Sequence, residues 1–230
     1  MSNNFSVTAL LPMKGHSERV PSKNTRIFGK DPLFFHILRS LESAKYVDQI
    51  LVDTDSPQII SLLKQNFPRV SIIERPKHLL GDKVPMNSII EHDIQYIKTD
   101  HFLQTHATNP LLKPDTIDYA IKCYFEGLNE GFDSVIGVTK YQTRFYDHNK
   151  IPVNHDPQIM LPSQDMLSLY EDNSNFYIIS IDNFMANKKR VGKTPLFVEV
   201  PKIECIDIDE PEDFIIAEAV YDFILNKNIN

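Results

Sequence analysis

Short apolar runs that favour β-strands alternate with segments of helical periodicity along most of this chain, and no other feature of the sequence constrains the fold as strongly. A strand, a helix and a second strand form a βαβ unit, and repeated units build a mostly parallel sheet covered by helices. The alternation therefore predicts an α/β fold. Sheets of this kind bind small molecules at the carboxyl ends of their strands, so we expect a site in the loops that follow strands.

The expected elements run from one end of the chain to the other. The predicted strands are residues 5–11, 49–52, 70–73, 101–105, 134–138, 176–181, 196–200 and 204–208. The predicted helices are residues 31–41, 59–67, 87–98, 115–125 and 212–225. Asp31 is expected to cap the first helix, with Pro32 in its first turn. Together these elements predict a Rossmann-like, mostly parallel sheet with helices on both faces, in a single domain of residues 1–230.

The alternation fails between residues 140 and 172, which are rich in proline, asparagine, histidine and scattered aromatic residues. A long irregular segment in a compact domain is usually functional, or it leaves the body to meet a partner. Two interpretations stay open: an arm that buries an interface, or a lid over the chain's own site. The apolar residues available for an interface are Phe145, Tyr146, Ile159, Met160, Leu161 and Tyr170.

Composition excludes several classes of protein. Two cysteines, Cys123 and Cys205, exclude a disulfide scaffold and a four-cysteine zinc site, and they favour a reducing, cytoplasmic compartment. The first four residues, Met-Ser-Asn-Asn, lack the basic start of a secretory signal, and no apolar run is long enough to span a membrane. The net charge of −7 argues against nucleic acid as a partner, although a few local cations could still hold an anionic small molecule.

The first loop after a strand, residues 12–30, carries the clearest chemistry. It contains five basic residues, Lys14, Arg19, Lys23, Arg26 and Lys30. Neither a G-x-G-x-x-G dinucleotide motif nor a Walker A motif is present. Gly15 lets the backbone approach a ligand closely, and backbone N–H groups with lysine charges can surround phosphate oxygens. The alternative is a solvated basic loop without a ligand.

Residues 11–24 read L-P-M-K-G-H-S-E-R-V-P-S-K-N, which resembles the I-P-A-R-G-G-S-K-G-I-P-R-K-N signature of the acylneuraminate (CMP-sialic acid) cytidylyltransferases. Pro12, Gly15, Ser17, Pro21, Lys23 and Asn24 match that signature, whereas Lys14 replaces its arginine and His16 its second glycine. Further segments resemble the family in the same order across residues 7–220: residues 29–33, 52–56, 74–79, 106–111, 133–135, 164–165, 175–178 and 206–213.

The resemblance implies a nucleotidyltransferase of polysaccharide biosynthesis. It implies that CTP is joined to the anomeric hydroxyl of a sialic-acid-like 2-keto sugar acid, giving a CMP-glycoside and pyrophosphate. Such a reaction needs cations on the triphosphate, a metal near the α-phosphate and a pocket for the attacking acid. The implied catalytic residues are Lys14, Lys23 and Asp209. The implied nucleotide-binding residues are Met13, Lys14, Gly15, Ser17, Lys23, Asn24 and Arg75, the last of which could instead be a surface arginine before a turn proline.

Asp207 and Asp209 are the expected ligands for Mg²⁺. On the predicted strand 204–208 and its continuation, positions i and i+2 point to one side, and hard carboxylate oxygens suit this ion. The alternative is that Asp209 caps the last helix, because Asp209-Glu210-Pro211-Glu212 is also a capping pattern. That alternative does not explain Asp207, an acid within an apolar strand.

The acceptor pocket is where the sequence departs from the family. His106 stands in place of a glutamine, and Leu112 and the Pro162-Ser163 pair stand where arginines are usual. A substrate carboxylate needs a cationic partner, and Arg144 is the nearest candidate, with Lys140 another. The expected substrate-binding residues are His106, Thr108, Asn109, Arg144, Gln164 and Asp165. His106 could instead be a structural histidine whose hydrogen bonds are satisfied inside the protein.

The resemblance also implies that residues 140–172 project into a twin subunit, so we expect a homodimer. Two other functions stay open. One is a nucleotidyltransferase for a different acceptor, such as 3-deoxy-octulosonate or a phosphorylated compound. The other is a non-catalytic paralogue that binds nucleotide, which the presence of Lys23, Asp207 and Asp209 disfavours.

Overall fold

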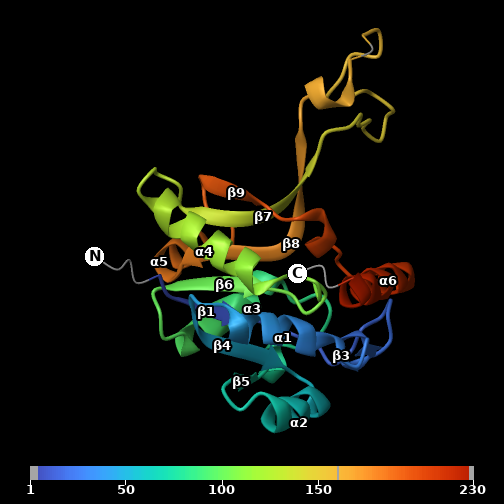
Figure 1. Ribbon diagram of the computed structural model, residues 1–230. Coiled ribbons are helices and arrows are strands. Elements are labelled where there is room, and N and C mark those ends of the chain that lie inside the picture. The colour runs from blue at the N-terminus through green and yellow to red at the C-terminus, as the bar shows by residue number, and fades with distance from the viewer. Residues whose placement is uncertain (1–4, 160, 228–230) are drawn as a thin grey trace.

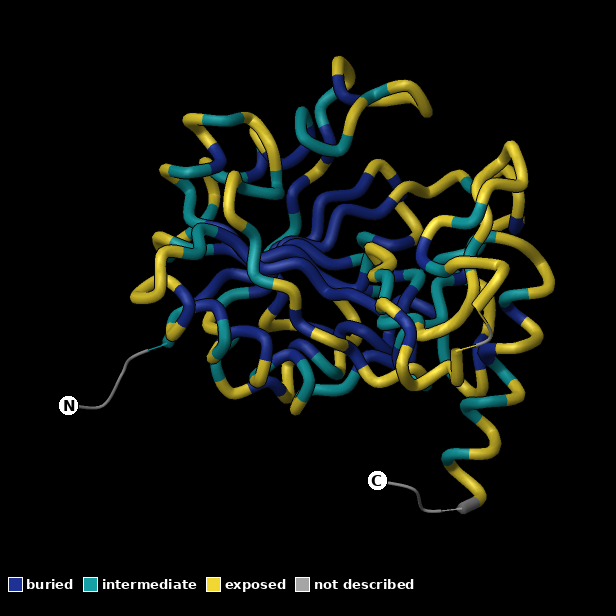
Figure 2. Tube along the Cα trace, turned by 90° about the horizontal axis from the view of Figure 1, so that it is seen from above, coloured by how far each residue is buried: buried dark blue, intermediate teal, exposed yellow. Residues whose placement is uncertain are grey.

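A computed structural model describes residues 5–159 and 161–227 (Figure 1). The expectations for residues 1–4 and for Met160 therefore lie outside the described residues. Strands run through the buried centre of the molecule, and exposed loops surround them (Figure 2). No helix in the described ranges has the length and apolar character that a membrane span requires.

Seven strands form one sheet in the order β5-β4-β1-β6-β8-β7-β9. The strands β1 (Val7–Leu10), β4 (Val47–Thr54), β5 (Ser71–Glu74) and β6 (His101–Thr105) are all parallel. The long strand β8 (Leu169–Ser180) is antiparallel to both β6 and β7 (Ser134–Tyr141), and β7 pairs in parallel with β9 (Pro195–Glu199). The prediction of a mostly parallel sheet is confirmed, with β8 as its one reversed strand.

Both faces of the sheet are buried because adjacent residues of a strand point to opposite sides. On one face, Ala9 and Leu103 pack with apolar residues of α1 (Leu33–Ser43), α2 (Pro57–Asn66) and α4 (Pro114–Leu128). On the other face, Leu10 and Phe102 pack with residues of α3 (Met86–Asp93) and α5 (Ile181–Asn187). The prediction of helices on both faces is confirmed.

A third apolar cluster attaches the last helix, α6 (Pro211–Lys227), to the first loop. Phe28 packs edge-on against Phe214, and it belongs to a short hairpin of β2 (Ile27–Phe28) and β3 (Asp31–Pro32) that the sequence did not predict. Gly29 connects the two strands with φ of 62°, and a Cβ at this position would lie 2.4 Å from a ring carbon of Tyr221. Only glycine fits both the conformation and the space.

Four details of the predicted elements are wrong. Asp31 does not cap α1; it lies in β3 and pairs with Arg39 (2.7 Å), and Pro32 occupies the cap position. Residues 204–208 are not a strand, because after the 3₁₀ turn Lys202–Glu204 they bond to a loop instead of a neighbouring strand. The helix expected at 87–98 ends at Asp93 and continues as the 3₁₀ turn Ile94–Tyr96. Helix α5 occupies residues that were partly assigned to a strand.

The irregular segment is an arm that extends from the ends of β7 and β8, drawn in yellow and orange in Figure 1. Its boundaries are narrower than expected, because residues 140–141 and 169–172 belong to those two strands. Asn154 joins its two limbs: the amide nitrogen donates to the carbonyl oxygens of Thr143 (2.7 Å) and Leu167 (2.8 Å). The arm does not fold back as a lid in this structure.

The turn between α5 and β9 is held by one carboxylate at the start of β7. Asp133 accepts hydrogen bonds from the backbone N–H groups of Lys193 (2.7 Å) and Thr194 (3.1 Å). Burial raises the pKa of Asp133, but these donors outweigh it and leave the pKa below its ordinary value of 3.8. The carboxylate therefore stabilises the fold above that pH, and its contribution is lost as the pH falls through the lowered pKa.

We predict that Asp133→Ala lowers the free energy of unfolding at pH 7 by about 1–3 kcal/mol, because two backbone donors lose a charged acceptor. Denaturant unfolding measures the change. Glu130→Ala, which removes an exposed carboxylate nearby, is the control and should leave the stability unchanged. Equal stabilities of the two variants would contradict this role of Asp133.

Candidate active site

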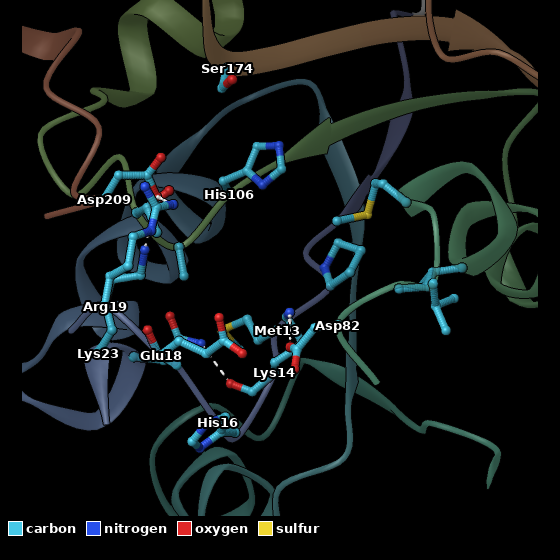
Figure 3. Close-up of a pocket in the computed structure, with 18 of the residues that line it drawn as sticks. Met13, Lys14, His16, Glu18, Arg19, Lys23, Asp82, His106, Ser174 and Asp209 are labelled. Atoms are coloured by element: carbon cyan, nitrogen blue, oxygen red, sulfur yellow. Dashed lines mark hydrogen bonds and ion pairs between the residues drawn. The ribbon is translucent and has the colours of Figure 1, made fainter. Parts of the chain in front are cut away.

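A cleft of about 590 Å³ opens at the carboxyl ends of β1 and β6 (Figure 3). Most residues that the sequence singled out line it. They are Met13, Lys14, Ser17, Lys23 and Asn24 of the first loop, Arg75 after β5, His106 and Thr108 after β6, and Asp207 and Asp209 before α6. The topology thus brings four separate segments together where an open α/β sheet binds its ligand.

The first loop is held in place by its polar residues. Asn24 donates to the carbonyl oxygen of Lys14 (2.9 Å), and the Lys14 ammonium pairs with Asp82 (2.7 Å) while remaining half exposed. The backbone N–H of Gly15 donates to Asp55 (2.6 Å). A Cβ on Gly15 would lie 2.8 Å from Cβ of Ser56, so this residue permits a close approach to the start of α2 rather than lining the cleft.

Lys23 connects the first loop to the late acidic pair. Its ammonium donates to the carbonyl oxygen of Ile208 (2.6 Å) and to the Asp209 carboxylate (3.2 Å), and only 12% of the side chain is exposed. Arg19 pairs with the same carboxylate (3.0 Å). Burial raises the pKa of Asp209, but the charges of Lys23 and Arg19 outweigh it, so the pKa lies below its usual value and the group is ionised at neutral pH.

Asp207 lies beside this pair without being on a strand. The N–H of Ile208 donates to the carbonyl oxygen of Thr108 (2.9 Å), which fixes the segment against the loop after β6. The Asp207 Oδ1 atom is buried and has no hydrogen-bond partner among the described residues. Burial raises the pKa of Asp207 and the neighbouring Asp209 charge adds to this effect, while Thr108 and the charge of Lys23 oppose it without cancelling it. An unpartnered carboxylate oxygen next to a second carboxylate is a donor set that fits a hard divalent cation.

The last helix does not use Asp209 as its cap. The Asp213 carboxylate, in the first turn of α6, accepts the N–H groups of Asp209 (3.0 Å) and Glu210 (2.8 Å), and among the described residues the Asp209 carboxylate contacts Lys23 and Arg19 instead of the helix N–H groups. The side chain of Asp209 is therefore free to face the cleft, where Lys23 and Arg19 meet it.

His106 lies on the side of the cleft away from Lys14 in the view of Figure 3. Its Nε2 atom accepts from Gln104 Nε2 (3.1 Å) and faces Arg190 Nη1 (3.4 Å). Burial and the charge of Arg190 lower the pKa of His106 to about 4, so the ring is neutral at pH 7. His106 therefore makes a hydrogen bond inside the protein, through Gln104, and it also lines the cleft.

Besides Gly15, four expected site residues do not line the cleft. Arg144, Gln164 and Asp165 are in the arm, where Arg144 donates to the carbonyl oxygen of Leu161 (2.8 Å) and lines a separate hollow of about 430 Å³ with Asp165. Within one chain these three do not reach the cleft. Asn109 is fully buried and does not line it.

Several residues of the cleft region were not assigned from the sequence, and Arg19, Gln104 and Arg190 are the ones that hold its charged groups in place. Arg19 stood in the basic loop, and its position there was the available signal. Gln104 is an amide inside the buried strand β6, and a polar side chain at a strand position expected to be buried is a signal that could have been used. Arg190 follows two lysines in an exposed turn, and nothing in the sequence distinguishes it from them.

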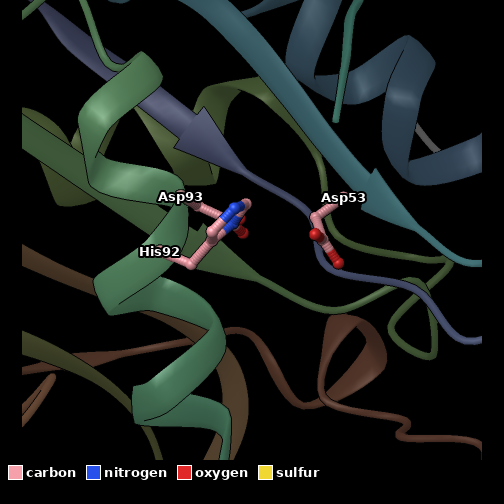
Figure 4. A group of neighbouring side chains, drawn as sticks. All are labelled: Asp53, His92 and Asp93. Atoms are coloured by element: carbon pink, nitrogen blue, oxygen red, sulfur yellow. The ribbon is translucent and has the colours of Figure 1, made fainter. Parts of the chain in front are cut away.

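A buried ionisable cluster lies beneath the first loop (Figure 4). Asp53 pairs with the Nε atom of Arg75, whose Nη2 atom donates to the carbonyl oxygen of Met13 (3.4 Å). Arg75 is therefore buried and positions the loop, rather than being a surface arginine. His92 contacts Asp93 (3.0 Å), and carboxylate oxygens of Asp93 and Asp53 lie within 4.8 Å of each other.

These groups are neutralised without a metal. Burial and the neighbouring Asp53 charge raise the pKa of Asp93 to about 8. Because Arg75 pairs with Asp53 and not with Asp93, the shared proton resides on Asp93 at neutral pH. One guanidinium and one proton thus balance two carboxylates, and Asp207 with Asp209 is the better cation site.

The Asp93 pKa makes stability depend on pH. Between the ordinary carboxyl pKa of 3.8 and about 8, the folded protein holds a proton that the unfolded chain releases, so stability falls as the pH rises. We predict that Asp93→Asn, which keeps a hydrogen-bond donor but cannot titrate, gains stability relative to the native protein by roughly 1 kcal/mol per pH unit across this range. Denaturant unfolding at pH 5, 6.5 and 8 measures the difference, and parallel pH profiles would contradict it.

Comparisons with known proteins agree with this geometry. Residues 8–223 match the protein family described as cytidylyltransferase. A pseudaminic acid cytidylyltransferase of Campylobacter jejuni is 21% identical, over 92% of this chain and 94% of its own. A CMP-N,N'-diacetyllegionaminic acid synthase of Legionella pneumophila is 24% identical, over 93% of this chain and 95% of its own.

The fold has a solved counterpart. The structure of a CMP:2-keto-3-deoxy-manno-octonic acid synthetase complexed with CTP superimposes with a TM-score of 0.71 at 10% identity, covering 95% of this chain and 99% of the other. This likeness bears on the fold alone. Because the family match covers nearly all of the strands, the helices and the cleft, the chain belongs to the cytidylyltransferase family and is a nucleotidyltransferase.

Proposed function

We propose that this protein transfers the cytidylyl group of CTP to a sialic-acid-like 2-keto sugar acid, forming a CMP-glycoside and releasing pyrophosphate. The observation that carries the proposal is the contact of Lys23 with Asp209, which puts the basic first loop and the acidic pair in one cleft. The relatives named for pseudaminic and diacetyllegionaminic acid support an acidic nine-carbon acceptor. Acceptor, metal and subunit arrangement are part of the proposal.

In the proposed reaction the anomeric hydroxyl oxygen of the acid attacks the α-phosphorus. The bond from that phosphorus to the oxygen shared with the β-phosphate breaks, pyrophosphate leaves, and the hydroxyl proton passes to solvent. Lys14 and Lys23 offset the negative charge of the triphosphate and of the pyrophosphate that leaves it. Gly15 and Asn24 keep the loop in the conformation that presents these lysines. Ser17 and Met13 line the nucleotide side of the cleft. Their place in the cleft supports binding of the nucleotide against the first loop.

Asp207 and Asp209 would hold Mg²⁺, which when bound offsets charge at the α-phosphate. The unpartnered Oδ1 atom of Asp207 supports this assignment. Lys23 and Arg19 already contact Asp209, so they would keep its carboxylate ionised and oriented toward the cleft. Thr108 and His106 are proposed to contact the acceptor on the opposite side.

We predict that the purified protein, given CTP and Mg²⁺, releases pyrophosphate with at least one member of a panel of sugar acids. The panel contains N-acetylneuraminic, pseudaminic, N,N'-diacetyllegionaminic and 3-deoxy-manno-octulosonic acids, and repeating it with UTP and ATP tests the base preference. Asp209→Ala should lower kcat at least about 100-fold, because the charge at the α-phosphate loses its counterion site.

Glu212→Ala, which removes an exposed carboxylate in the first turn of α6, is the matched control and should retain activity. Absence of pyrophosphate with every acid, together with no CTP-dependent rise in melting temperature, would reject the proposed function. Normal turnover by Asp209→Ala would reject the metal assignment only.

The homodimer is proposed from the arm. Tyr146, Ile159 and Leu161 of the arm are about half exposed, and Leu167 is 75% exposed, which leaves apolar surface for a second subunit to cover. In such a dimer the arm residues Arg144, Gln164 and Asp165 would meet the partner's surface instead of their own cleft.

We predict a dimer in solution by light scattering, and a monomer for Leu167→Glu, because a buried charge without a partner opposes association. Tyr119→Glu, a similarly exposed site on α4, is the control and should remain dimeric. A native protein that is monomeric at micromolar concentration would contradict this part of the proposal.

A further inference from the structure

Arg190 differs from the other basic residues of the cleft. Lys14 pairs with Asp82, Lys23 and Arg19 pair with Asp209, and Arg75 pairs with Asp53. Within residues 5–159 and 161–227, no carboxylate lies within 4.0 Å of Arg190 in an ion pair. Its side chain lines the cleft and is partly buried. A partly buried guanidinium without a counterion favours binding of an anion.

Neutral groups nevertheless hold Arg190 in a fixed position. Its Nη1 atom donates to Gln104 Oε1 (2.8 Å), and its Nη2 atom donates to the hydroxyl of Tyr177 (3.1 Å). The guanidinium carbon lies 3.8 Å from the centre of the Tyr177 ring, which is a cation–π contact. The Tyr177 hydroxyl in turn donates to Asp172 (2.6 Å). The head group is thus oriented before any ligand binds.

These contacts leave part of the guanidinium available. The group has five N–H donors. Nη1 faces Gln104 and His106 and Nη2 uses one hydrogen for Tyr177, while Nε has no partner among the described residues. Two donors, on Nε and Nη2, remain, and a guanidinium with two free N–H groups binds the two oxygens of a carboxylate well.

The adjacent histidine adds a neutral donor. Gln104 Nε2 donates to the carbonyl oxygen of Thr105 (2.8 Å), which fixes the direction of its amide and makes Nε2 a donor toward His106 Nε2. His106 Nε2 therefore carries no hydrogen, and the proton of the neutral ring is on Nδ1. The ring can offer this N–H to an anion beside Arg190.

We infer that Arg190, with His106 beside it, binds the carboxylate of the acceptor, and that this pair takes the place of the arginines that the sequence lacks near Leu112 and Ser163. The inference rests on the proposed function, because it names the group on the acceptor that this side of the cleft recognises. The substrate class is then a sugar acid with a free carboxylate close to the reacting hydroxyl. Arg190 acts on binding and takes no part in proton transfer.

The loop that carries Arg190 is set by the turn that Asp133 holds. Gly192 approaches Asp133 so closely that a Cβ would lie 2.1 Å from its carboxylate, and the N–H of Gly192 donates to Ser134 (2.9 Å). The backbone of Arg190 is therefore held by its turn, and its guanidinium is held by Gln104 and Tyr177. This rigidity is what a specificity-determining residue requires.

The test compares Arg190→Gln with Lys189→Gln in steady-state kinetics, using the panel acid that gives the highest turnover. We expect Arg190→Gln to raise KM for the acid about 30- to 100-fold and to leave KM for CTP within about twofold, because a charged hydrogen bond to one substrate is lost. Lys189 is exposed and outside the cleft, so its variant should match the native enzyme.

A second comparison separates recognition from a structural role. The carboxamide of the same acid should be a much poorer substrate for the native enzyme, whereas Arg190→Gln should barely distinguish acid from amide. A purely structural role would weaken both acceptors equally and would overturn the inference. Should Arg190→Gln fail to fold, Arg190→Lys keeps the charge and should show a smaller rise in KM with a reduced preference for the acid.

The kinetic results separate failure of the Arg190 assignment from failure of the proposed function. Native activity on a sugar acid, with Arg190→Gln equal to Lys189→Gln, overturns this inference and leaves the proposed function intact. No pyrophosphate from the native protein with any sugar acid overturns this inference, and the same result together with no CTP-dependent rise in melting temperature also rejects the proposed function. Turnover of a phosphorylated sugar alcohol in place of any sugar acid would assign Arg190 to a phosphate and contradict the carboxylate.

Discussion

The structure depends on one ionic contact, between Lys23 in the first loop and Asp209 before the last helix, which lie 186 residues apart in the chain. The lysine also donates to the carbonyl oxygen of Ile208, so it fixes both the side chain and the backbone of the acidic segment. Asp209 is kept ionised by this contact, and the basic loop is kept close to two carboxylates. Cations for a polyphosphate and oxygen ligands for a divalent ion therefore face the same cleft.

Much of the fold follows from apolar periodicity. The strands β1, β4 and β6 and the helices α1, α2 and α4 were predicted because they bury apolar residues on the sheet. The run at 204–208 is also rich in apolar residues, but no strand of the described residues pairs with it, and its backbone bonds to the loop at Thr108. An aspartate before a proline is typical of a helix N-cap, yet Asp31 pairs with Phe28 in the hairpin of β2 and β3 and does not cap α1. Such outcomes depend on tertiary neighbours that a sequence pattern does not contain.

The site likewise contains residues that the sequence could predict and residues that it could not. The residues of the first loop and the acidic pair were predictable, because each lies in a distinctive local pattern. Arg190 was not, because its place depends on the turn held by Asp133 and on the contacts with Gln104 and Tyr177. Arg75 lines the cleft as expected, and the structure also buries it against Asp53, where it donates to the carbonyl oxygen of Met13. Supporting residues of this kind are recognised only when the neighbours are known.

The central claim is that the triphosphate lies between the first loop and the acidic pair. A crystal structure with CTP and Mn²⁺, in which anomalous scattering locates the ion, tests it most directly. We expect phosphate oxygens within hydrogen-bonding distance of Lys14 and Lys23, and Mn²⁺ bound by Asp207 and Asp209. Triphosphate bound outside this cleft, or Mn²⁺ bound at Asp53 and Asp93 instead, would contradict it.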